Sequence, residues 1–334
     1  MDKKIINELA NINGISAYEK DVREYFINQI KDYVDSYEID PLGNVITKIC
    51  GSKQGKDIAV VAHMDEVGFL VKRIGDDGLI NIICIGGVDL HTINNCQVTV
   101  NGFDGVVLLK PVKDEKVIEI KNFVVDLGFT SKEQVVESGI KIGYMINFKN
   151  NFLTLQNNHI ASKALDDRLG VAALINLAKQ INNNLEYGCV YLCASVQEEL
   201  GLRGATTITS SFPSELKDVL VIDVSPISDY YSPESCKLGN GALLRVQDPG
   251  MLFNHDIINQ FRKLASDNDI KAQEFFSLGG TDSKAIEISK DGFKVGALCI
   301  PARCLHASNT IVNLDDYFAV CNLSYLYIKE VTRG

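Results

Sequence analysis

The chain of 334 residues carries 33 Lys and Arg against 43 Asp and Glu, which gives a formal net charge of −10. Its hydrophobic content of 46% with 23% charged residues supplies enough apolar surface for a packed core and excludes disordered and fibrous classes. Such a negative charge repels nucleic acid and anionic membranes, so we expect neither as a partner, whereas small ligands and divalent metal ions stay open.

The cysteines and the first residues predict a cytoplasmic protein. The nine cysteines are odd in number, fall within apolar runs and form no Cys-x-x-Cys pair, so we predict that they are reduced residues of the core. The chain starts without the continuous apolar segment of a signal peptide, and no run reaches the ~18 apolar residues of a membrane span.

At its start, the chain is predicted to form two helices followed by two strands. Residues 5–9 have apolar side chains at helical spacing, and Ser16-Ala17-Tyr18-Glu19 has the pattern of a capping box that opens a second helix through Phe26. Residues 45–49 and 58–62 are short β-branched runs, and the second is apolar enough to be a strand buried on both faces.

The middle of the chain has a different texture, with many short strand-like segments separated by Gly, Asn and Asp turns. This pattern predicts a small β-rich barrel or sandwich. The segments are residues 69–74, 79–85, 97–100, 105–109 and 145–148.

After residue 160 helices and buried strands alternate, which is typical of an α/β sheet with helices on both faces. The predicted helices are 167–181, 257–265 and a final one, 314–328, opened by Asn313; the predicted strands are 189–196, 219–222 and 295–300. We therefore predict an α/β fold with a doubly wound, mostly parallel sheet. Residues 1–67 and 158–334 would form one catalytic domain, interrupted by an inserted β-rich domain at 68–157.

Polar side chains follow several of the buried strands at the point where each strand ends. His63 follows the strand 58–62, Glu198 and Glu199 follow 189–196, and Asp223 follows 219–222. His306 lies in the loop after 295–300, and Asp166 precedes the helix 167–181. Since ligands bind at the carboxyl edge of open α/β sheets, we expect these residues to converge on one crevice.

Two imidazoles and several carboxylates in one cleft require a compensating cation, and a pair of metal ions supplies it. Imidazole and carboxylate ligands suit Zn²⁺ and related ions, and a bridging aspartate is a recurrent feature of two-metal hydrolases. With Asp166 as the bridge, His63 and Asp223 can complete the shell of one ion while Glu199 and His306 complete that of the other.

Two further acids have supporting roles in this hypothesis. Asp65 lies two residues after His63 on the same face of an extended chain, where its carboxylate can accept the second ring N–H of the imidazole. Glu198 is placed to act as general base. Each residue alone would more often be a helix cap or a solvated strand end, but together they favour a site.

All of these residues except Asp223 lie in four segments, and a fifth segment adds a further motif. The four are VAHMDEVGF at 61–69, KALDDR at 163–168, VQEELGLRGA at 196–205 and LHAS at 305–308, and the fifth is GGTD at 279–282. In order and spacing they closely resemble the M42 family of dinuclear metallo-aminopeptidases, along nearly the whole chain. The resemblance implies a phosphorylase/hydrolase-like zinc peptidase fold with a small inserted β-barrel that mediates dimerisation. It also implies that dimers assemble into a dodecamer, and that the peptide bond between Asp166 and Asp167 is cis.

The resemblance further implies two divalent ions, with Zn²⁺ expected first and Co²⁺ or Mn²⁺ also accepted. It implies Glu198 as the base, Asp65 as the residue that orients an imidazole, and these metal ligands: His63, Asp166, Glu199, Asp223 and His306. We predict a cytoplasmic metal-dependent aminopeptidase that hydrolyses N-terminal residues from short peptides, with a metal-bridging water and Glu198 as general base. The acids favour a protonated amino terminus, whereas a preference for an acidic N-terminal residue would need a local cation.

Two alternatives are weighed against this hypothesis. A glucanase-type glycoside hydrolase could use the paired carboxylates, but it gives the two histidines no role, and the chain has no Trp for sugar stacking. An inactive metal-binding scaffold is the other alternative, although the proposed base and every proposed ligand are present.

Overall fold

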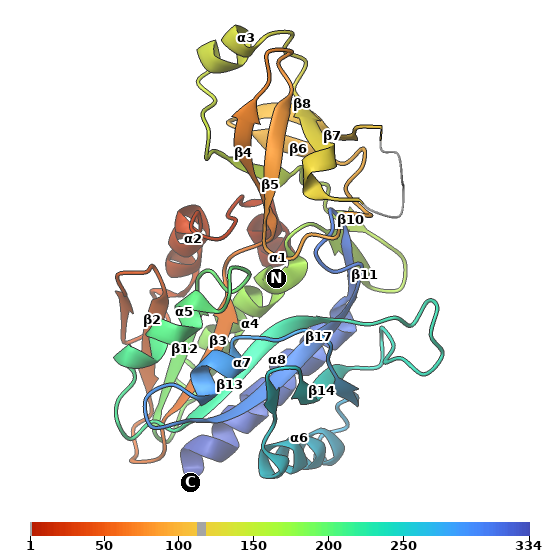
Figure 1. Ribbon diagram of the computed structural model, residues 1–334. Coiled ribbons are helices and arrows are strands. Elements are labelled where there is room, and N and C mark those ends of the chain that lie inside the picture. Colours follow the sequence, from red (N-terminus) through yellow and green to blue (C-terminus); the bar gives the residue numbers. More distant parts are fainter. Residues whose placement is uncertain (1, 112–117) are drawn as a thin grey trace.

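The computed structural model describes residues 2–111 and 118–334, and within these ranges the strands form two separate sheets (Figure 1). A large mixed sheet and its helices make up the main body, and a closed barrel stands at one end of it. Each part has its own hydrophobic core. The predicted fold class, a doubly wound α/β sheet with an inserted β-barrel, is therefore confirmed.

The N-terminal segment forms both predicted helices, α1 (Asp2–Asn11) and α2 (Lys20–Ile30), but the predicted capping box is wrong. The Ser16 hydroxyl donates to Asp65 Oδ2 at 2.6 Å, and the Glu19 carboxylate accepts the backbone N–H of Gln197 at 3.0 Å. Both side chains thus bind residues far along the chain, so helix α2 begins at Lys20 without a side-chain cap.

Parallel strands form the centre of the large sheet, and antiparallel strands flank them. The order is β1-β2-β12-β3-β13-β17-β18-β11-β10, in which β12, β3, β13 and β17 run parallel. Every residue of β3 is buried, as predicted for a strand covered on both faces. The strands are β1 (Ser36–Ile39), β2 (Val45–Cys50), β3 (Ile58–His63), β10 (Leu153–Thr154), β11 (His159–Ser162), β12 (Cys189–Ser195), β13 (Asp218–Pro226), β14 (Ala242–Asp248), β15 (Met251–Leu252), β16 (Ala272–Phe276), β17 (Lys294–Arg303) and β18 (Thr310–Asn313).

Helix α4 packs against β3 and β13 and is itself contacted by α1, α2 and α8, while α5 and α7 contact each other and pack on β12 and β17. Asn313 caps α8 as predicted, because its side chain accepts the backbone N–H of Asp315 at 2.7 Å. In the described part of the chain, no helix has both the length and the hydrophobicity to cross a membrane. The helices are α4 (Leu165–Ile181), α5 (Arg203–Ile208), α6 (His255–Asp267), α7 (Ser283–Glu287) and α8 (Leu314–Arg333), with a 3-10 turn η2 (Thr209–Ser211).

The inserted strands close into a barrel in the order β4-β5-β8-β7-β6-β9, so the sandwich alternative is wrong. Phe69 and Phe148 stack edge to face in the barrel core, with ring centroids 5.4 Å apart. The chain then returns to the large sheet, where β10 pairs with β11. The barrel elements are β4 (Gly68–Ile74), β5 (Ile80–Ile85), β6 (Gln97–Val100), β7 (Phe103–Leu109), β8 (Phe123–Asp126) and β9 (Met145–Phe148), with η1 (Ile120–Asn122) and α3 (Lys132–Glu137).

A buried arginine fixes the segment between β3 and the barrel. Arg168, fully buried in α4, donates from Nε to the Met64 carbonyl at 2.7 Å and from Nη1 to the Leu9 carbonyl at 2.7 Å. Nearby, the buried Lys163 ammonium binds both carboxylate oxygens of Glu66 at 2.8 and 2.9 Å. These contacts join α1, α4 and the residues after β3, where the predicted site begins.

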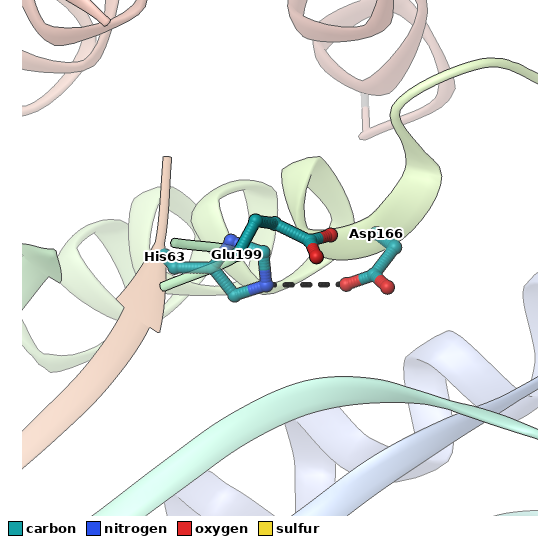
Figure 2. Close-up of side chains that lie close together, drawn as sticks. All are labelled: His63, Asp166 and Glu199. Atoms are coloured by element: carbon teal, nitrogen blue, oxygen red, sulfur yellow. Dashed lines mark hydrogen bonds and ion pairs between the residues drawn. The ribbon is translucent and has the colours of Figure 1, made fainter. Parts of the chain in front are cut away.

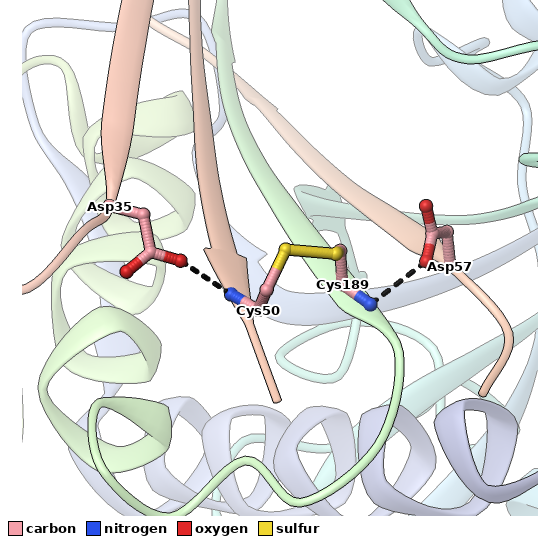
Figure 3. The surroundings of a disulfide bond; sticks show 4 residues. All are labelled: Asp35, Cys50, Asp57 and Cys189. Atoms are coloured by element: carbon pink, nitrogen blue, oxygen red, sulfur yellow. Dashed lines mark hydrogen bonds between the residues drawn. A yellow bond between two sulfur atoms is a disulfide. The ribbon is translucent and has the colours of Figure 1, made fainter. Parts of the chain in front are cut away.

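The prediction that all cysteines are reduced is wrong for two of them. Cys50 of β2 and Cys189 of β12 form a disulfide (Figure 3), because the antiparallel register places them directly opposite each other. The backbone N–H groups of both residues donate to carboxylates, Cys50 to Asp35 at 2.8 Å and Cys189 to Asp57 at 2.9 Å. The other seven cysteines form no disulfide. The disulfide removes one of the arguments for a cytoplasmic location, which stays a prediction.

We expect the replacement of both Cys50 and Cys189 by Ser to lower the free energy of unfolding by about 2–4 kcal/mol, because the disulfide closes a long loop in the unfolded chain. Denaturant titration of the oxidised protein and the variant measures the difference. The exposed Cys304→Ser is the control and should leave the unfolding curve unchanged. Nine reactive thiols in the unreduced, denatured protein, instead of seven, would show that the disulfide does not form.

Candidate metal centre

The predicted site residues come together around one cavity of about 550 Å³ at the carboxyl edge of the parallel strands. His63 ends β3, and Ser195, which ends β12, lies opposite it in register. Asp65 is buried next to the cavity, with no exposed surface. The members of the predicted set that line the cavity are His63, Asp166, Glu198, Glu199, Asp223 and His306.

The carboxylate of Asp166 lies between the two histidines. Its Oδ1 is 3.2 Å from His63 Nε2, and its Oδ2 is 3.2 Å from His306 Nε2. His63, Asp166 and Glu199 each offer a ligand atom within 4.8 Å of the others (Figure 2). Asp223 Oδ1 lies 3.9 Å from His63 Nε2, and Glu199 Oε1 lies 3.2 Å from His306 Nε2. One carboxylate thus faces two imidazoles, each with a further acid beside it.

Both imidazoles are oriented through their other ring nitrogen. His63 Nδ1 lies 3.1 Å from the Asp65 carbonyl, and His306 Nδ1 lies 3.0 Å from the carbonyl of Gly87, the second residue after β5 of the barrel. A carbonyl oxygen only accepts hydrogen bonds, so Nδ1 carries the proton in both rings. In the neutral imidazole, Nε2 is then the lone-pair atom directed at Asp166.

Asp65 connects one of these imidazoles to the acidic pair after β12. Its Oδ1 lies 3.4 Å from His63 Nδ1 and accepts the backbone N–H of Glu198 at 2.9 Å, while Oδ2 accepts that of Glu199 at 3.2 Å. Burial alone would raise the pKa of Asp65, but hydrogen bonding and the charge of His63 outweigh it and lower the pKa. Asp65 therefore stays ionised and ties the loop of the two glutamates to His63.

The carboxylates around the cavity carry more negative charge than their protein neighbours offset. Burial and the charge of Asp166 raise the pKa of Asp223 to about 8. Burial likewise raises the pKa of Glu198 well above its usual range, with Asp223 adding to the effect. Burial alone would lower the pKa of His306, but hydrogen bonds with Asp166 and Glu199 raise it to about 11. This electrostatic pattern favours a bound cation.

The turn after β12 is shaped to present the two glutamates. Gln197 has φ +55°, and the backbone N–H groups of Gly201 and Leu202 both donate to the Glu198 carbonyl at 2.9 Å. A Cβ on Gly204 would lie 2.2 Å from the Val196 carbonyl, so only glycine allows this close return of the chain. The tight turn holds Glu198 and Glu199 at the cavity rather than in solvent.

Two buried acids belong to the site but received no role from the sequence. Asp167, joined to Asp166 by the cis peptide bond that the resemblance implied, accepts the backbone N–H groups of Gly170 at 2.9 Å and of His63 at 3.3 Å. With His63 and Asp223 it forms a second group of ligand atoms within 4.8 Å. Asp282, in the GGTD segment, accepts the Ser195 hydroxyl at 2.6 Å. The only signals for them in the sequence were the position of Asp167 next to Asp166 and the GGTD motif that contains Asp282.

The donor set fits divalent metal ions. Imidazole Nε2 and carboxylate oxygen atoms are the ligands that Zn²⁺ and related ions prefer, and both rings are held in the tautomer that metal binding requires. The two groups of candidate ligands share His63, and Asp166 extends from one of them to His306. These residues could therefore hold a metal ion. Because a different acid lies beside each imidazole, Asp223 beside His63 and Glu199 beside His306, the site has ligands for a second ion as well.

Comparisons with known proteins identify the family of this chain. A family model described as M42 glutamyl aminopeptidase matches residues 43–323. The lysyl aminopeptidase of Pyrococcus furiosus is 29% identical, covering 99% of this chain and 98% of its own. An aminopeptidase structure from the archaeon Desulfurococcus kamchatkensis has a TM-score of 0.93 at 32% identity, covering 99% of this chain and 95% of that one.

A further solved structure is the TET1 peptidase of Pyrococcus horikoshii, described as assembling into a tetrahedron or a large octahedral shell. It has a TM-score of 0.88 at 31% identity, covering 99% of this chain and all of that one. Because the family model spans most of the chain and these similarities extend from end to end, the chain belongs to the M42 glutamyl aminopeptidase family and is an aminopeptidase by class.

Proposed function

We propose that this aminopeptidase is metal-dependent and removes N-terminal residues from short peptides at the cavity of the candidate metal centre. The observation that carries the proposal is the carboxylate of Asp166, whose two oxygens each face the Nε2 of a different histidine at 3.2 Å. A single carboxylate shared by two imidazoles is the arrangement expected of a bridging ligand in a two-metal hydrolase.

Two divalent ions would be held by the predicted ligands, one by His63, Asp166 and Asp223 and the other by Asp166, Glu199 and His306. Zn²⁺ is the first expectation, and Co²⁺ or Mn²⁺ suits the same donors. When bound, such ions polarise the scissile carbonyl and lower the pKa of the attacking water.

The protein's own residues move the proton and position the groups. The Glu198 carboxylate lines the cavity and, in the described part of the chain, forms no ion pair with a histidine. It would accept the proton of the attacking water and return it to the leaving amine. Asp65 would keep the backbone of Glu198 and the ring of His63 in place through the contacts described above.

The glycosidase and scaffold alternatives have less support. Paired carboxylates that flank a glycosidic bond do not need two imidazoles between them, yet both histidines here contact Asp166 directly. An inactive scaffold gives no reason for an ionisable Glu198 in the cavity wall. The peptidase function therefore has the stronger support.

We also propose a homo-oligomer, in which residues 68–157 mediate dimers that assemble further into a dodecamer. The TET1 peptidase, similar along its whole length, is described as assembling into a tetrahedron or a large octahedral shell. The barrel strand β7 exposes Phe103 and Val106, which a partner subunit would cover. Analytical ultracentrifugation of the full chain tests the assembly.

We expect the metal-reconstituted protein to hydrolyse aminoacyl-p-nitroanilides, and excess chelator to abolish this activity until Zn²⁺, Co²⁺ or Mn²⁺ is restored, because the predicted ligands hold the ions that activate the water. A panel of N-terminal residues with an N-acetylated substrate as control measures it. Release of reducing sugar from glucans would support the glycosidase instead. A metal-loaded protein that hydrolyses no substrate of the panel would support the inactive metal-binding scaffold.

A further inference from the structure

The cavity of the candidate metal centre carries two charges that the proposed chemistry does not use. Among the described residues that line it, Arg245 and Lys284 are the charged ones outside the predicted ligands and base, and both are cationic. We propose that Lys284 forms a carboxylate-binding subsite in this cavity, with Arg245 fixing the wall beside it. The proposal rests on the proposed function, since the carboxylate belongs to a peptide substrate.

Arg245 is held rigidly and its charge is already balanced. The side chain is 1% exposed; Nη1 donates to the Ser225 hydroxyl at 2.9 Å, and Nη2 donates to the Gly279 carbonyl. Its Nε lies 3.3 Å from Oδ2 of Asp248, which is also buried. Arg245 therefore joins the end of β13 to the loop of residues 277–280 and shapes the wall, while Asp248 offsets its charge.

Lys284 is different because its ammonium has no partner. It lies on the short helix α7, and among the described residues no hydrogen bond or ion pair involves its Nζ. Its stem lies against the β14–β15 turn, since a Cβ added at Gly250 would come within 2.4 Å of Lys284 Cδ. By contrast, the buried Lys163 is paired with Glu66 on both carboxylate oxygens. Lys284 is thus an exposed cation without a partner among the described residues, at the edge of the cavity.

The balance of charges in the cavity favours an anionic ligand at this position. Four carboxylates line the cavity, and two divalent ions held by the predicted ligands would offset them. Arg245 and Asp248 offset each other. Among the side chains that line the cavity, the ammonium of Lys284 is the charge that remains. The carboxylate is the anionic group that a peptide offers.

Two parts of a short peptide carry that group. One is the side chain of an N-terminal Glu or Asp, and the other is the C-terminal carboxylate of a dipeptide or tripeptide. A cavity of about 550 Å³ is in the usual range for a small ligand. The lysyl relative and the glutamyl name of the family show that membership alone does not fix the preferred residue.

The first experiment compares substrates that differ only in the charge of the N-terminal side chain. We expect Lys284→Met, which keeps an aliphatic stem, to lower the ratio of kcat/KM for Glu- over Gln-p-nitroanilide by about tenfold or more, mainly through KM. Lys284→Arg should restore most of the ratio. Lys3→Met, an exposed lysine on α1 outside the cavity, is the charge-matched control and should leave the ratio unchanged.

The second experiment tests the other source of the carboxylate. The same variants are compared on the dipeptide Leu-Gly and on its C-terminal amide, and binding of free L-glutamate and L-glutamine to the metal-loaded protein is measured by calorimetry. If only the dipeptide ratio depends on Lys284, the subsite binds the peptide's C-terminus. If Lys284→Met changes neither ratio and leaves the glutamate affinity intact, the subsite proposal is wrong. A wild-type protein that cleaves none of these substrates would instead contradict the proposed function.

Discussion

We expect Glu198→Gln to lower kcat by about 10²–10⁴-fold while both metal ions stay bound, because glutamine has the shape of glutamate but cannot accept the proton of the attacking water. The KM should change little, since Glu198 is proposed to act on the reacting atoms rather than to bind the substrate. Steady-state kinetics on a preferred aminoacyl substrate and metal analysis of the purified variant measure the two quantities.

The neighbouring Glu199→Gln is the matched control for this substitution. The two residues share the same turn and the same carboxylate support, since Asp65 accepts the backbone N–H of each. Glu199 Oε1 lies 3.2 Å from His306 Nε2, so the Glu199→Gln protein should lose metal from that side of the site. A Glu198→Gln protein with near-normal kcat would exclude the base role, and one depleted of metal would make Glu198 a ligand.

We expect Asp166→Ala to remove both metal ions and, with them, the peptidase activity. Each oxygen of Asp166 faces a different imidazole, so a single substitution would take one ligand from each ion. The loss of an outer-shell partner typically lowers metal affinity by about 10–100-fold, and the loss of Asp166 should lower it further. Metal content after dialysis against a weak chelator, measured per chain, provides the test.

A folding defect must be separated from loss of metal in this variant. Asp316→Ala is the control. Asp316 is also buried and accepts the backbone N–H groups of Gly239 at 2.7 Å and Gly241 at 2.6 Å, but it does not line the cavity. That variant should unfold more easily yet keep its metal. If the Asp166→Ala protein is folded and retains two tightly bound ions, Asp166 does not bridge them.

The fold was predictable where the pattern of the sequence is strong. The central strands are continuous apolar runs such as residues 58–62, and helices of several turns show their period. Strands β14 and β16 were missed because polar residues such as Arg245 and Glu274 interrupt them, and the helices α5 and α7 are too short for a period to appear. The disulfide depends on the register between β2 and β12, which no spacing of cysteines along the chain determines.

The candidate site was predictable because several polar residues follow buried strands, and parallel strands end at the same edge of a sheet. The structure places those residues around one cavity. The parts that sequence reasoning missed are set by tertiary contacts instead. A surface lysine such as Lys284 carries no signal of its own, and the role of Asp167 depends on the return of α4 to the backbone of His63.

The hydrogen bond from His306 to the Gly87 carbonyl has a consequence for how this protein can be divided or recombined. Gly87 follows the barrel strand β5, and beside it a Cβ on Gly86 would lie 3.2 Å from Glu199 Oε2. The segment after β5 therefore helps to orient a histidine of the candidate metal centre, so the barrel is not an independent module. Hybrids that graft the barrel of one relative onto the body of another should keep peptidase activity only when the short segment 86–89 comes from the same relative as the body. The rest of the barrel can then differ between relatives.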